Sequence, residues 1–360
     1  MPFSRALING ERWPDEAGAH VNAHGGGVLR HGGRLWWFGE HKVAGPAGNR
    51  AEVGVSAYSS ADGLSWRREG VALEASDDPG SPLRRGCVIE RPKVLRCPDT
   101  GRFAMWFHFE AWGQEGYRTA RAGVAVADLP AGPYRLVSLI RPDAGQWPRG
   151  EPPADCRPLS EAERTLMESR SHRGDNMEPG DDRLLWRRDH AGGQMSRDQT
   201  VFADPAGGAW HVRASEENST LHVSRLRDGW LGTAGDYWRV FPGGFHEAPC
   251  LCRHRGRYWL LTSGCTGWAP NAARLAVADR PEGPWTALGN PCQGPAGPHG
   301  GPETTFGGQG ACLWRHADGR WIWCLDLWRP GDAEDGRYAW LPLEWEGDRP
   351  VVRWRERWEG

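Results

Sequence analysis

The chain lacks several features that would point to whole classes of protein. It has no apolar run of 18 residues, and its start, MPFSRALINGERW, has no apolar stretch, so we expect neither a membrane span nor an export signal. Charges nearly balance, with a net charge of −2 at pH 7, which gives no electrostatic case for binding nucleic acid or a membrane. The sequence as given predicts a cytoplasmic protein, unless a leader was removed.

Lysine is scarce, helical periodicity is almost absent, and the cysteines fit no known metal framework. The cysteine count is nine, which is odd, and Cys250 and Cys252 alternate along an apolar segment. Buried free thiols are therefore expected rather than zinc ligands or a set of disulfides.

Glycine, proline and tryptophan are abundant, with 50, 28 and 22 residues. The first two indicate many turns. Tryptophan in excess suits stacking on flat apolar faces such as those of sugar rings. Packing between sheets is the plainer explanation, and we expect it to account for more than half of the tryptophans.

Five segments share a glycine turn followed by an aromatic-rich strand. They are GGRLWWFGE, TGRFAMWFHFE, GGAWHVRASE, RGRYWLLTSG and DGRWIWCLDLW. A short apolar strand precedes each, a third strand follows each, and four continue toward an edge strand. This repetition predicts an all-β fold, a five-bladed β-propeller that forms a single domain over residues 1–360.

A polar residue stands 9 to 11 positions before each turn glycine, where the first strand of each repeat begins. These residues are His24 (with Asn22 close by), Glu90, Asp198, Glu247 and Gln309. The first strand of each propeller blade lines the central channel, so the five side chains are expected to meet at one mouth of it. The alternative is that acids at strand starts simply cap turns.

Residues 140–197 break the repeat between blades 2 and 3 and show no strand alternation. Ser160 and Glu163 form a capping box, which predicts a helix over residues 161–170. The rest of this insertion is predicted to be mostly irregular. Its position directly before Asp198 suggests a lid over the channel mouth, with disorder as the alternative.

The ordered motifs AHGGG, ERPKV, SRDQTVF, EAP, TGWAPN and the glutamine of FGGQ resemble glycoside hydrolase family 43, most closely its exo-β-1,3-galactanases. The resemblance implies a five-bladed propeller and an inverting, exo-acting hydrolysis that releases galactose from β-1,3-galactan-type glycans. It implies that Glu247 is the general acid and that Asp198 tunes the pKa of Glu247 and holds its orientation, as an acid that works near neutral pH requires.

The group that activates water is where this sequence departs from the wider family. Most members have an aspartate at the start of blade 1, where this chain reads Asn22-Ala23-His24. The galactanase resemblance implies that Gln309 orients the water and that Glu90 contacts sugar hydroxyls or acts as the base. A carboxylate of the insertion, Glu178 or Asp181, is an alternative.

The resemblance also implies a set of sugar contacts: Glu40, Tyr117, Asn218, Thr266 and Trp268. No cofactor or metal is required by the sequence, although the resemblance leaves open a divalent cation such as calcium in the channel near His24. The expected partner is a carbohydrate substrate, bound by a monomer. An α-L-arabinofuranosidase, a β-galactofuranosidase and a non-catalytic sugar-binding propeller remain alternative functions.

Overall fold

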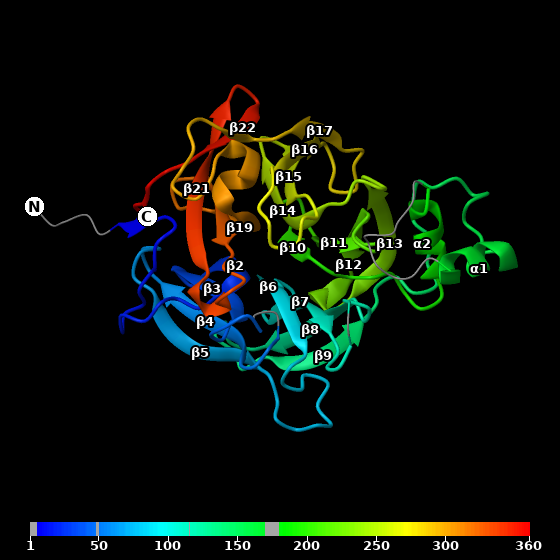
Figure 1. Ribbon diagram of the computed structural model, residues 1–360, viewed down its shortest axis with the longest axis horizontal. Coiled ribbons are helices and arrows are strands. Elements are labelled where there is room, and N and C mark those ends of the chain that lie inside the picture. The colour runs from blue at the N-terminus through cyan, green and yellow to red at the C-terminus, as the bar shows by residue number, and fades with distance from the viewer. Residues whose placement is uncertain (1–5, 48–49, 115, 170–179) are drawn as a thin grey trace, which may run out of the picture.

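The computed structural model describes residues 6–47, 50–114, 116–169 and 180–360. Five antiparallel sheets surround one axis (Figure 1), and within each of the first four the strand order follows the chain. Blade 1 contains β2 (His24–His31), β3 (Arg34–His41), β4 (Gly54–Ser60) and β5 (Arg67–Glu74). Blade 2 contains β6 (Val88–Arg96), β7 (Phe103–Glu110), β8 (Arg121–Ala127) and β9 (Arg135–Ile140). Blade 3 contains β10 (Gln199–Ala203), β11 (Ala209–Ser215), β12 (Thr220–Leu226) and β13 (Thr233–Val240). The predicted propeller is confirmed.

The last two blades close the ring. Blade 4 contains β14 (Glu247–His254), β15 (Arg257–Ser263), β16 (Arg274–Ala278) and β17 (Thr286–Gly289). Blade 5 contains β19 (Gln309–Arg315), β20 (Trp321–Leu327), β21 (Arg337–Glu346) and β22 (Arg349–Arg353), and β18 (Cys292–Gln293) pairs in parallel with β22. Strand β1 (Leu7–Ile8) pairs with β23 (Arg357–Trp358), which joins segments from opposite ends of the described chain. The described part of the chain also contains short 3₁₀ turns at Asp228–Trp230, Pro302–Gly307 and Ala333–Asp335.

Among the described residues, five apolar clusters each lie between two neighbouring blades, and a small sixth cluster lies within the insertion. Phe38 and Phe107 belong to the cluster between blades 1 and 2, and Trp37 and Trp340 to the one between blades 1 and 5. Strands β4 and β8 are rich in Gly, Ala, Ser and Val and are buried almost throughout. Small side chains there let the bulky aromatic side chains of neighbouring strands pack closely. More than half of the 22 tryptophans are buried, as predicted.

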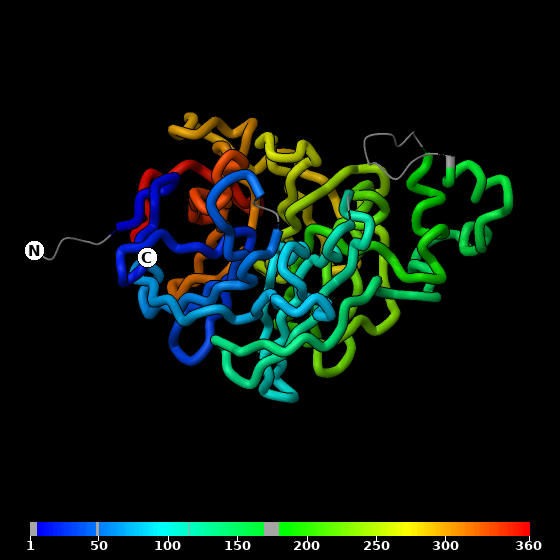
Figure 2. The backbone as a smooth tube through the Cα atoms, turned by 60° about the horizontal axis from the view of Figure 1, so that its bottom comes forward, coloured from blue at the N-terminus to red at the C-terminus, as the bar shows by residue number. Residues whose placement is uncertain are grey.

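The insertion carries two helices, α1 (Glu161–Ser169) and α2 (Asp182–Arg188). The predicted capping box is present: the Ser160 amide donates to Glu163 Oε2 at 2.7 Å, and the Glu163 amide donates to Ser160 Oγ at 3.3 Å. Both helices lie beside β13 at the outer rim of the ring, and the tilted view keeps them there (Figures 1 and 2). The helices therefore do not cover the channel mouth. A lid stays a prediction for the rest of the segment, of which residues 170–179 lie outside the described part.

All nine cysteines are free, and all but Cys156 and Cys265 are buried, which fits the expectation of buried thiols. None of the helices in the described ranges is long and apolar enough to cross a membrane.

Candidate active site

Three of the inner strands share a local distortion at the channel mouth. The register of β2, β6 and β14 shifts directly after His24, Glu90 and Glu247. In each strand the next residue is left-handed: Gly25 at φ 60°, Arg91 at 53° and Ala248 at 51°. A bulge of this kind bends the strand and re-aims the side chains beside it. Left-handed non-glycine residues are strained and concentrate at functional sites.

Gly25 shows why glycine is needed at the first of these positions. A Cβ there would lie 2.2 Å from Oε1 of Glu40. The Glu40 side chain is 4% exposed, its Oε1 accepts the backbone amide of Arg91 at 3.0 Å, and its Oε2 lies 2.5 Å from Nζ of Lys42. The glycine thus leaves room for a carboxylate that links blades 1 and 2.

Glu247 is the best candidate for an acid. Burial, followed by the negative charge of Asp198, raises the pKa of its carboxyl to about 8. Its Oε1 accepts a hydrogen bond from Asn218 Nδ2 at 2.8 Å, and the thiol of Cys265 also hydrogen-bonds to this carboxyl. Glu247 is therefore protonated at neutral pH and held in one orientation, as a general acid must be.

Asp198 lies next to Glu247 rather than across the channel from it. Its Oδ2 accepts the backbone amide of Ala248 at 3.0 Å and lies 3.0 Å from Nη2 of Arg91. The guanidinium pairs with the Asp198 carboxylate, so a negative charge is held close to the candidate acid.

Glu90 is built into a charged row with His108 and Glu110. His108 Nδ1 lies 2.9 Å from Glu90 Oε2, and its Nε2 lies 2.8 Å from Glu110 Oε1. Although burial disfavours the charged ring, the hydrogen bonds with Glu110 and Glu90 raise the pKa of His108 to about 9. Burial opposes ionisation of Glu90, but the bond with His108 lowers its pKa below the ordinary value. Glu90 is thus a carboxylate suited to accepting hydrogen bonds.

Gln309 has a fixed amide orientation. Its Oε1 accepts from Arg91 Nη2 at 2.5 Å and from Trp328 Nε1 at 2.9 Å, and its Nε2 donates to Ser263 Oγ at 3.0 Å. Arginine and the tryptophan indole only donate, so the atom they share must be the oxygen. These bonds favour the ordinary amide form, whose N–H groups can orient a water molecule.

The other predicted sugar contacts lie around this group. The Tyr117 hydroxyl donates to Glu90 Oε1 at 2.8 Å, and Asn218 is bound to Glu247 as described. Trp268 is 44% exposed and meets Trp328 edge-on at 5.6 Å between ring centroids. Thr266 is exposed, and its hydroxyl is bonded within its own loop to Ala269.

A cavity of about 210 Å³ lies beside the site. Trp268, Trp328, Gln309, Ser263 and Arg337 are among its lining residues. Its wall presents exposed aromatic surface next to the amide of Gln309, a combination typical of sugar-binding sites.

Of the two insertion carboxylates considered as alternatives, only Asp181 lies among the described residues. Asp181 is buried at the start of α2, beside β13, and is not free to swing into the channel. Glu178 lies outside the described residues.

Three residues of the site, Arg91, His108 and Cys265, were not predicted from the sequence. Arg91 contacts Asp198 and Gln309 and also lies 5.6 Å from the Trp328 ring. Two sequence signals were available: Arg91 follows Glu90 directly in ERPKV, and Cys265 precedes TGWAPN. Neither signal states which way a side chain points, because a bulge reverses the alternation there.

Two places bear on metal binding. Glu90, His108 and Asp198 bring one ligand atom each within 4.8 Å of one another, but both ring nitrogens of His108 are engaged by carboxylates. Near the predicted calcium position, His24 Nδ1 and Asp326 Oδ1 lie 3.8 Å apart, buried and without a hydrogen-bond partner among the described residues. Calcium takes six to eight oxygen ligands, which can include waters, so a cation near His24 stays a prediction.

Comparison with known proteins identifies chains similar to this one. No family model matches the chain. A solved β-1,3-galactosidase of family GH43, bound to galactodeoxynojirimycin, is 40% identical over 98% of this chain and 99% of that one, with a TM-score of 0.90. An exo-β-1,3-galactanase from Clostridium thermocellum is 30% identical over 97% of this chain and 64% of its own, with a TM-score of 0.74.

Two further likenesses differ in coverage. The exo-β-1,3-galactanase of Phanerochaete chrysosporium, solved with β-1,3-galactotriose, is 27% identical over 98% of this chain and 68% of its own, with a TM-score of 0.76. A curated xylosidase/arabinosidase from Thermoclostridium stercorarium is 30% identical over 144 residues, 38% of this chain, and the match spans only 28% of that protein.

Fold and likeness together define a glycoside hydrolase built on a five-bladed propeller. With 40% identity to a GH43 enzyme over nearly the full length of both chains, the chain belongs to glycoside hydrolase family 43. The resemblance inferred from its motifs is confirmed, while the roles of the individual site residues stay predictions.

Proposed function

We propose that this protein is an inverting, exo-acting hydrolase that releases galactose from the ends of β-1,3-linked galactans. The observation that carries the proposal is the Glu247 carboxyl, which the raised pKa keeps protonated at neutral pH beside the negative charge of Asp198. The galactosidase and galactanases to which the chain is similar support the choice of sugar.

Glu247 gives its proton to the glycosidic oxygen as the bond to the anomeric carbon breaks. The leaving sugar departs with a new hydroxyl, and Glu247 becomes a carboxylate that the Asn218 amide stabilises. Asp198, fixed by Arg91 and the Ala248 amide, keeps the pKa of the acid high before the reaction.

Water attacks the anomeric carbon from the opposite face, which inverts its configuration. Gln309 suits the task of orienting this water, because Arg91 and Trp328 fix its oxygen and leave the amide nitrogen toward Ser263 as the donor. Glu90 suits the binding of sugar hydroxyls, since its lowered pKa keeps it an ionised acceptor and makes it a weak base. Trp268 offers an exposed face for stacking on a sugar ring.

The test is hydrolysis of β-1,3-galactobiose followed by proton NMR. We expect free galactose that appears first as the α-anomer. Glu247→Gln should lower kcat by about 10³-fold or more and still bind galactose, because an amide cannot donate the required proton. Release of the β-anomer would refute inversion, and full activity of the Glu247→Gln variant would refute the assignment of the acid.

The likeness to a xylosidase/arabinosidase favours one other candidate substrate class. Aryl α-L-arabinofuranoside and aryl β-xyloside therefore belong in the same assay. Faster turnover of either compound than of an aryl β-galactoside would show that galactose is not the preferred sugar. The assignment of Glu247 as the acid would stand.

A further inference from the structure

The turn between β11 and β12 is strained. Glu216, Glu217 and Asn218 are three consecutive non-glycine residues in the left-handed region, at φ 52°, 57° and 69°. Such a conformation is unfavourable for a residue with a side chain, and it persists only where the surroundings impose it. Three in a row therefore need strong external contacts.

Those contacts come from buried charges. Glu216 is held by Arg239 at 2.7 Å and His222 at 2.6 Å. Glu217, 3% exposed, is held by Arg197 Nη2 at 2.6 Å and by Arg188 Nη2 at 3.1 Å.

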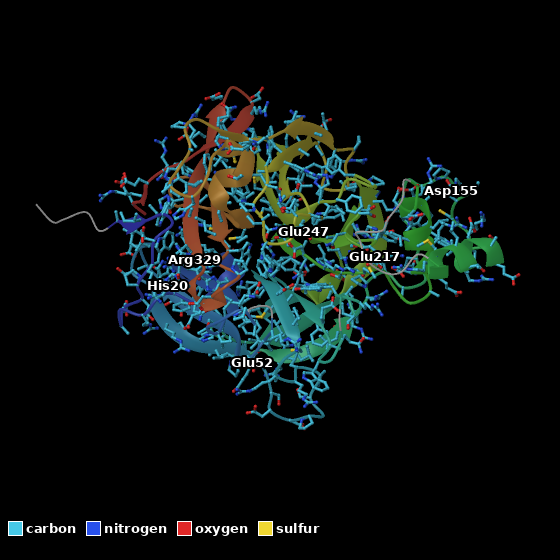
Figure 3. The ribbon with its side chains drawn as sticks, in the orientation of Figure 1. His20, Glu52, Asp155, Glu217, Glu247 and Arg329 are labelled. Atoms are coloured by element: carbon cyan, nitrogen blue, oxygen red, sulfur yellow. The ribbon has the colours of Figure 1, made fainter. Side chains whose placement is uncertain are left out.

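Both cations on Glu217 belong to the insertion. Arg188 is the last residue of α2, and Arg197 is the last residue before blade 3 resumes at Asp198. Arg239 extends the link, since its Nη1 lies 2.8 Å from Glu151 of the insertion. In Figure 3 Glu217 lies between Glu247 and the side of the molecule where the insertion's Asp155 is labelled.

The turn ends on the candidate acid, because Asn218 Nδ2 donates to Glu247 Oε1. The charged or titratable groups that face Glu247 from the other elements are Asp198, Arg91, Cys265 and Arg197. Among these, Arg197 also belongs to the insertion, and its Nη2 donates to the backbone carbonyl of Tyr117. The insertion therefore reaches the acid by a short chain of contacts.

We propose that the insertion is a brace for the general acid: Arg188 and Arg197 are positioning residues that hold the Glu217–Asn218 turn so that Asn218 fixes the carboxyl of Glu247. This inference rests on the proposed hydrolase function for its catalytic meaning. It gives the peripheral α2 a role in the reaction that does not require it to cover the channel.

The test variant is Arg188→Met, which removes one of the two cations and keeps the length of the side chain. Asp189, the other partner of Arg188, still has Arg141 at 3.6 Å. We expect kcat on β-1,3-galactobiose to fall about tenfold, and kcat on an aryl galactoside with an acidic leaving group to fall less than about threefold, because the second reaction needs little protonation.

The pH profile supplies a readout that a general loss of stability would not move. The Asn218 hydrogen bond favours the ionised form of Glu247, so its loss raises the pKa of the acid. The alkaline limb of kcat should therefore shift to higher pH in Arg188→Met, and Arg188→Lys should restore most of the ratio and the limb.

Arg149→Met is the matched control. Arg149 also belongs to the insertion and pairs with Asp236 of β13 at 2.6 Å, but its side chain is 66% exposed. We expect both substrates and the pH limb to be unchanged there. Amide hydrogen exchange of a peptide covering residues 214–220 should rise in Arg188→Met and stay unchanged in Arg149→Met.

A folded Arg188→Met protein with the original substrate ratio, pH limb and exchange would overturn the inference. If Arg188→Met does not fold, Glu217→Gln, which weakens the same contacts from the other side, must give the same signature or the inference fails. Absence of galactosidase activity in the unmodified protein would instead count against the proposed function, and the exchange comparison would still decide whether the insertion holds the turn.

Discussion

Two interfaces of the molecule, called here the aromatic seam and the ionic seam, are held together by opposite kinds of contact. Between blades 5 and 1 the contact is aromatic: Trp340 lies 5.1 Å from Trp37, 5.3 Å from Trp13 and 5.4 Å from Trp314 between ring centroids. Where the start of the insertion packs against blade 3, the contact is ionic. Arg213 Nη2 lies 2.8 Å from Asp143 Oδ2, and both side chains are fully buried.

The comparison separates contacts that stabilise the fold from contacts that fix the positions of side chains. Aromatic packing is favourable wherever apolar surface is removed from water, and it tolerates small rearrangements. A buried ion pair gains little net free energy, because desolvation offsets the attraction, but breaking it is strongly destabilising. We infer that the ionic seam defines the position of the loops beside the acid, whereas the aromatic seam closes the ring.

The largest effect is expected from Arg213→Met. It leaves the Asp143 carboxylate buried, with Ser224 as its remaining side-chain donor, and should lower the free energy of unfolding by about 3–5 kcal/mol. Urea denaturation measures this. Adding Asp143→Asn to Arg213→Met removes the unpaired charge and should recover most of the loss. A cost below about 1 kcal/mol for the single variant would show that the two seams do not differ in this way.

Trp340→Phe probes the aromatic seam. The change removes part of a fully buried ring, and the indole N–H has no hydrogen-bond partner among the described residues, so no acceptor is orphaned. We expect a loss of about 2 kcal/mol in the free energy of unfolding and unchanged kcat on β-1,3-galactobiose. A loss of kcat without a loss of stability would contradict the division between the seams.

The sequence was informative where the repeat determines position. A similar spacing from the turn glycines located five polar residues at blade starts: His24, Glu90, Asp198, Glu247 and Gln309. Contacts with Arg91 and Ala248 join Asp198, Gln309 and Glu247 into one site. Propeller symmetry converts sequence spacing into convergence, so no alignment was needed for that step.

The sequence was uninformative where a local conformation decides the contact. No glycine in the sequence marks the left-handed turn Glu216–Asn218, and the arginines that contact this turn stand at distant positions in the chain. The insertion was expected to fold over the channel mouth, but its helices lie at the outer rim. There Asp182 of α2, and Glu151 ahead of α1, pair with Arg239 on the outermost strand of blade 3. Ion pairs between segments far apart in the chain leave no periodic pattern.

Glu247→Gln should stabilise the protein with a distinctive pH dependence. The pKa of Glu247 is raised by burial and by Asp198 to about 8 in the folded state. The carboxyl is therefore neutral in both states below about pH 4, and between about pH 4.5 and 8 only the unfolded chain releases its proton. Stability of the original protein relative to the variant thus falls as the pH rises through this window.

We expect Glu247→Gln to gain about 1–2 kcal/mol between pH 5 and pH 8, less than the full shift implies because the group is partly exposed. Thermal unfolding at several pH values measures it. Asp318→Asn is a useful control, because the pKa of this exposed carboxyl is shifted the other way. Burial acts to raise that pKa, but hydrogen bonds with Arg320 and His316 lower it below the ordinary value. Equal stability of Glu247→Gln and the original protein at pH 5 and pH 8 would show that the pKa of Glu247 is not raised.

The smallest expected effect comes from Cys265→Ser, which changes one donor on the acid and leaves both seams intact. Burial and then the charge of Glu247 raise the pKa of the Cys265 thiol, so it stays protonated and donates a weak hydrogen bond to the carboxyl. A serine hydroxyl is a stronger donor and favours the ionised form of Glu247. The alkaline limb of kcat should move to lower pH by about half a unit, while Cys156→Ser, in the insertion, should leave it in place. A shift in the opposite direction would mean that the thiol acts on Glu247 through burial rather than through its hydrogen bond, which would place the control of the acid in the apolar packing around it instead of in its polar partners.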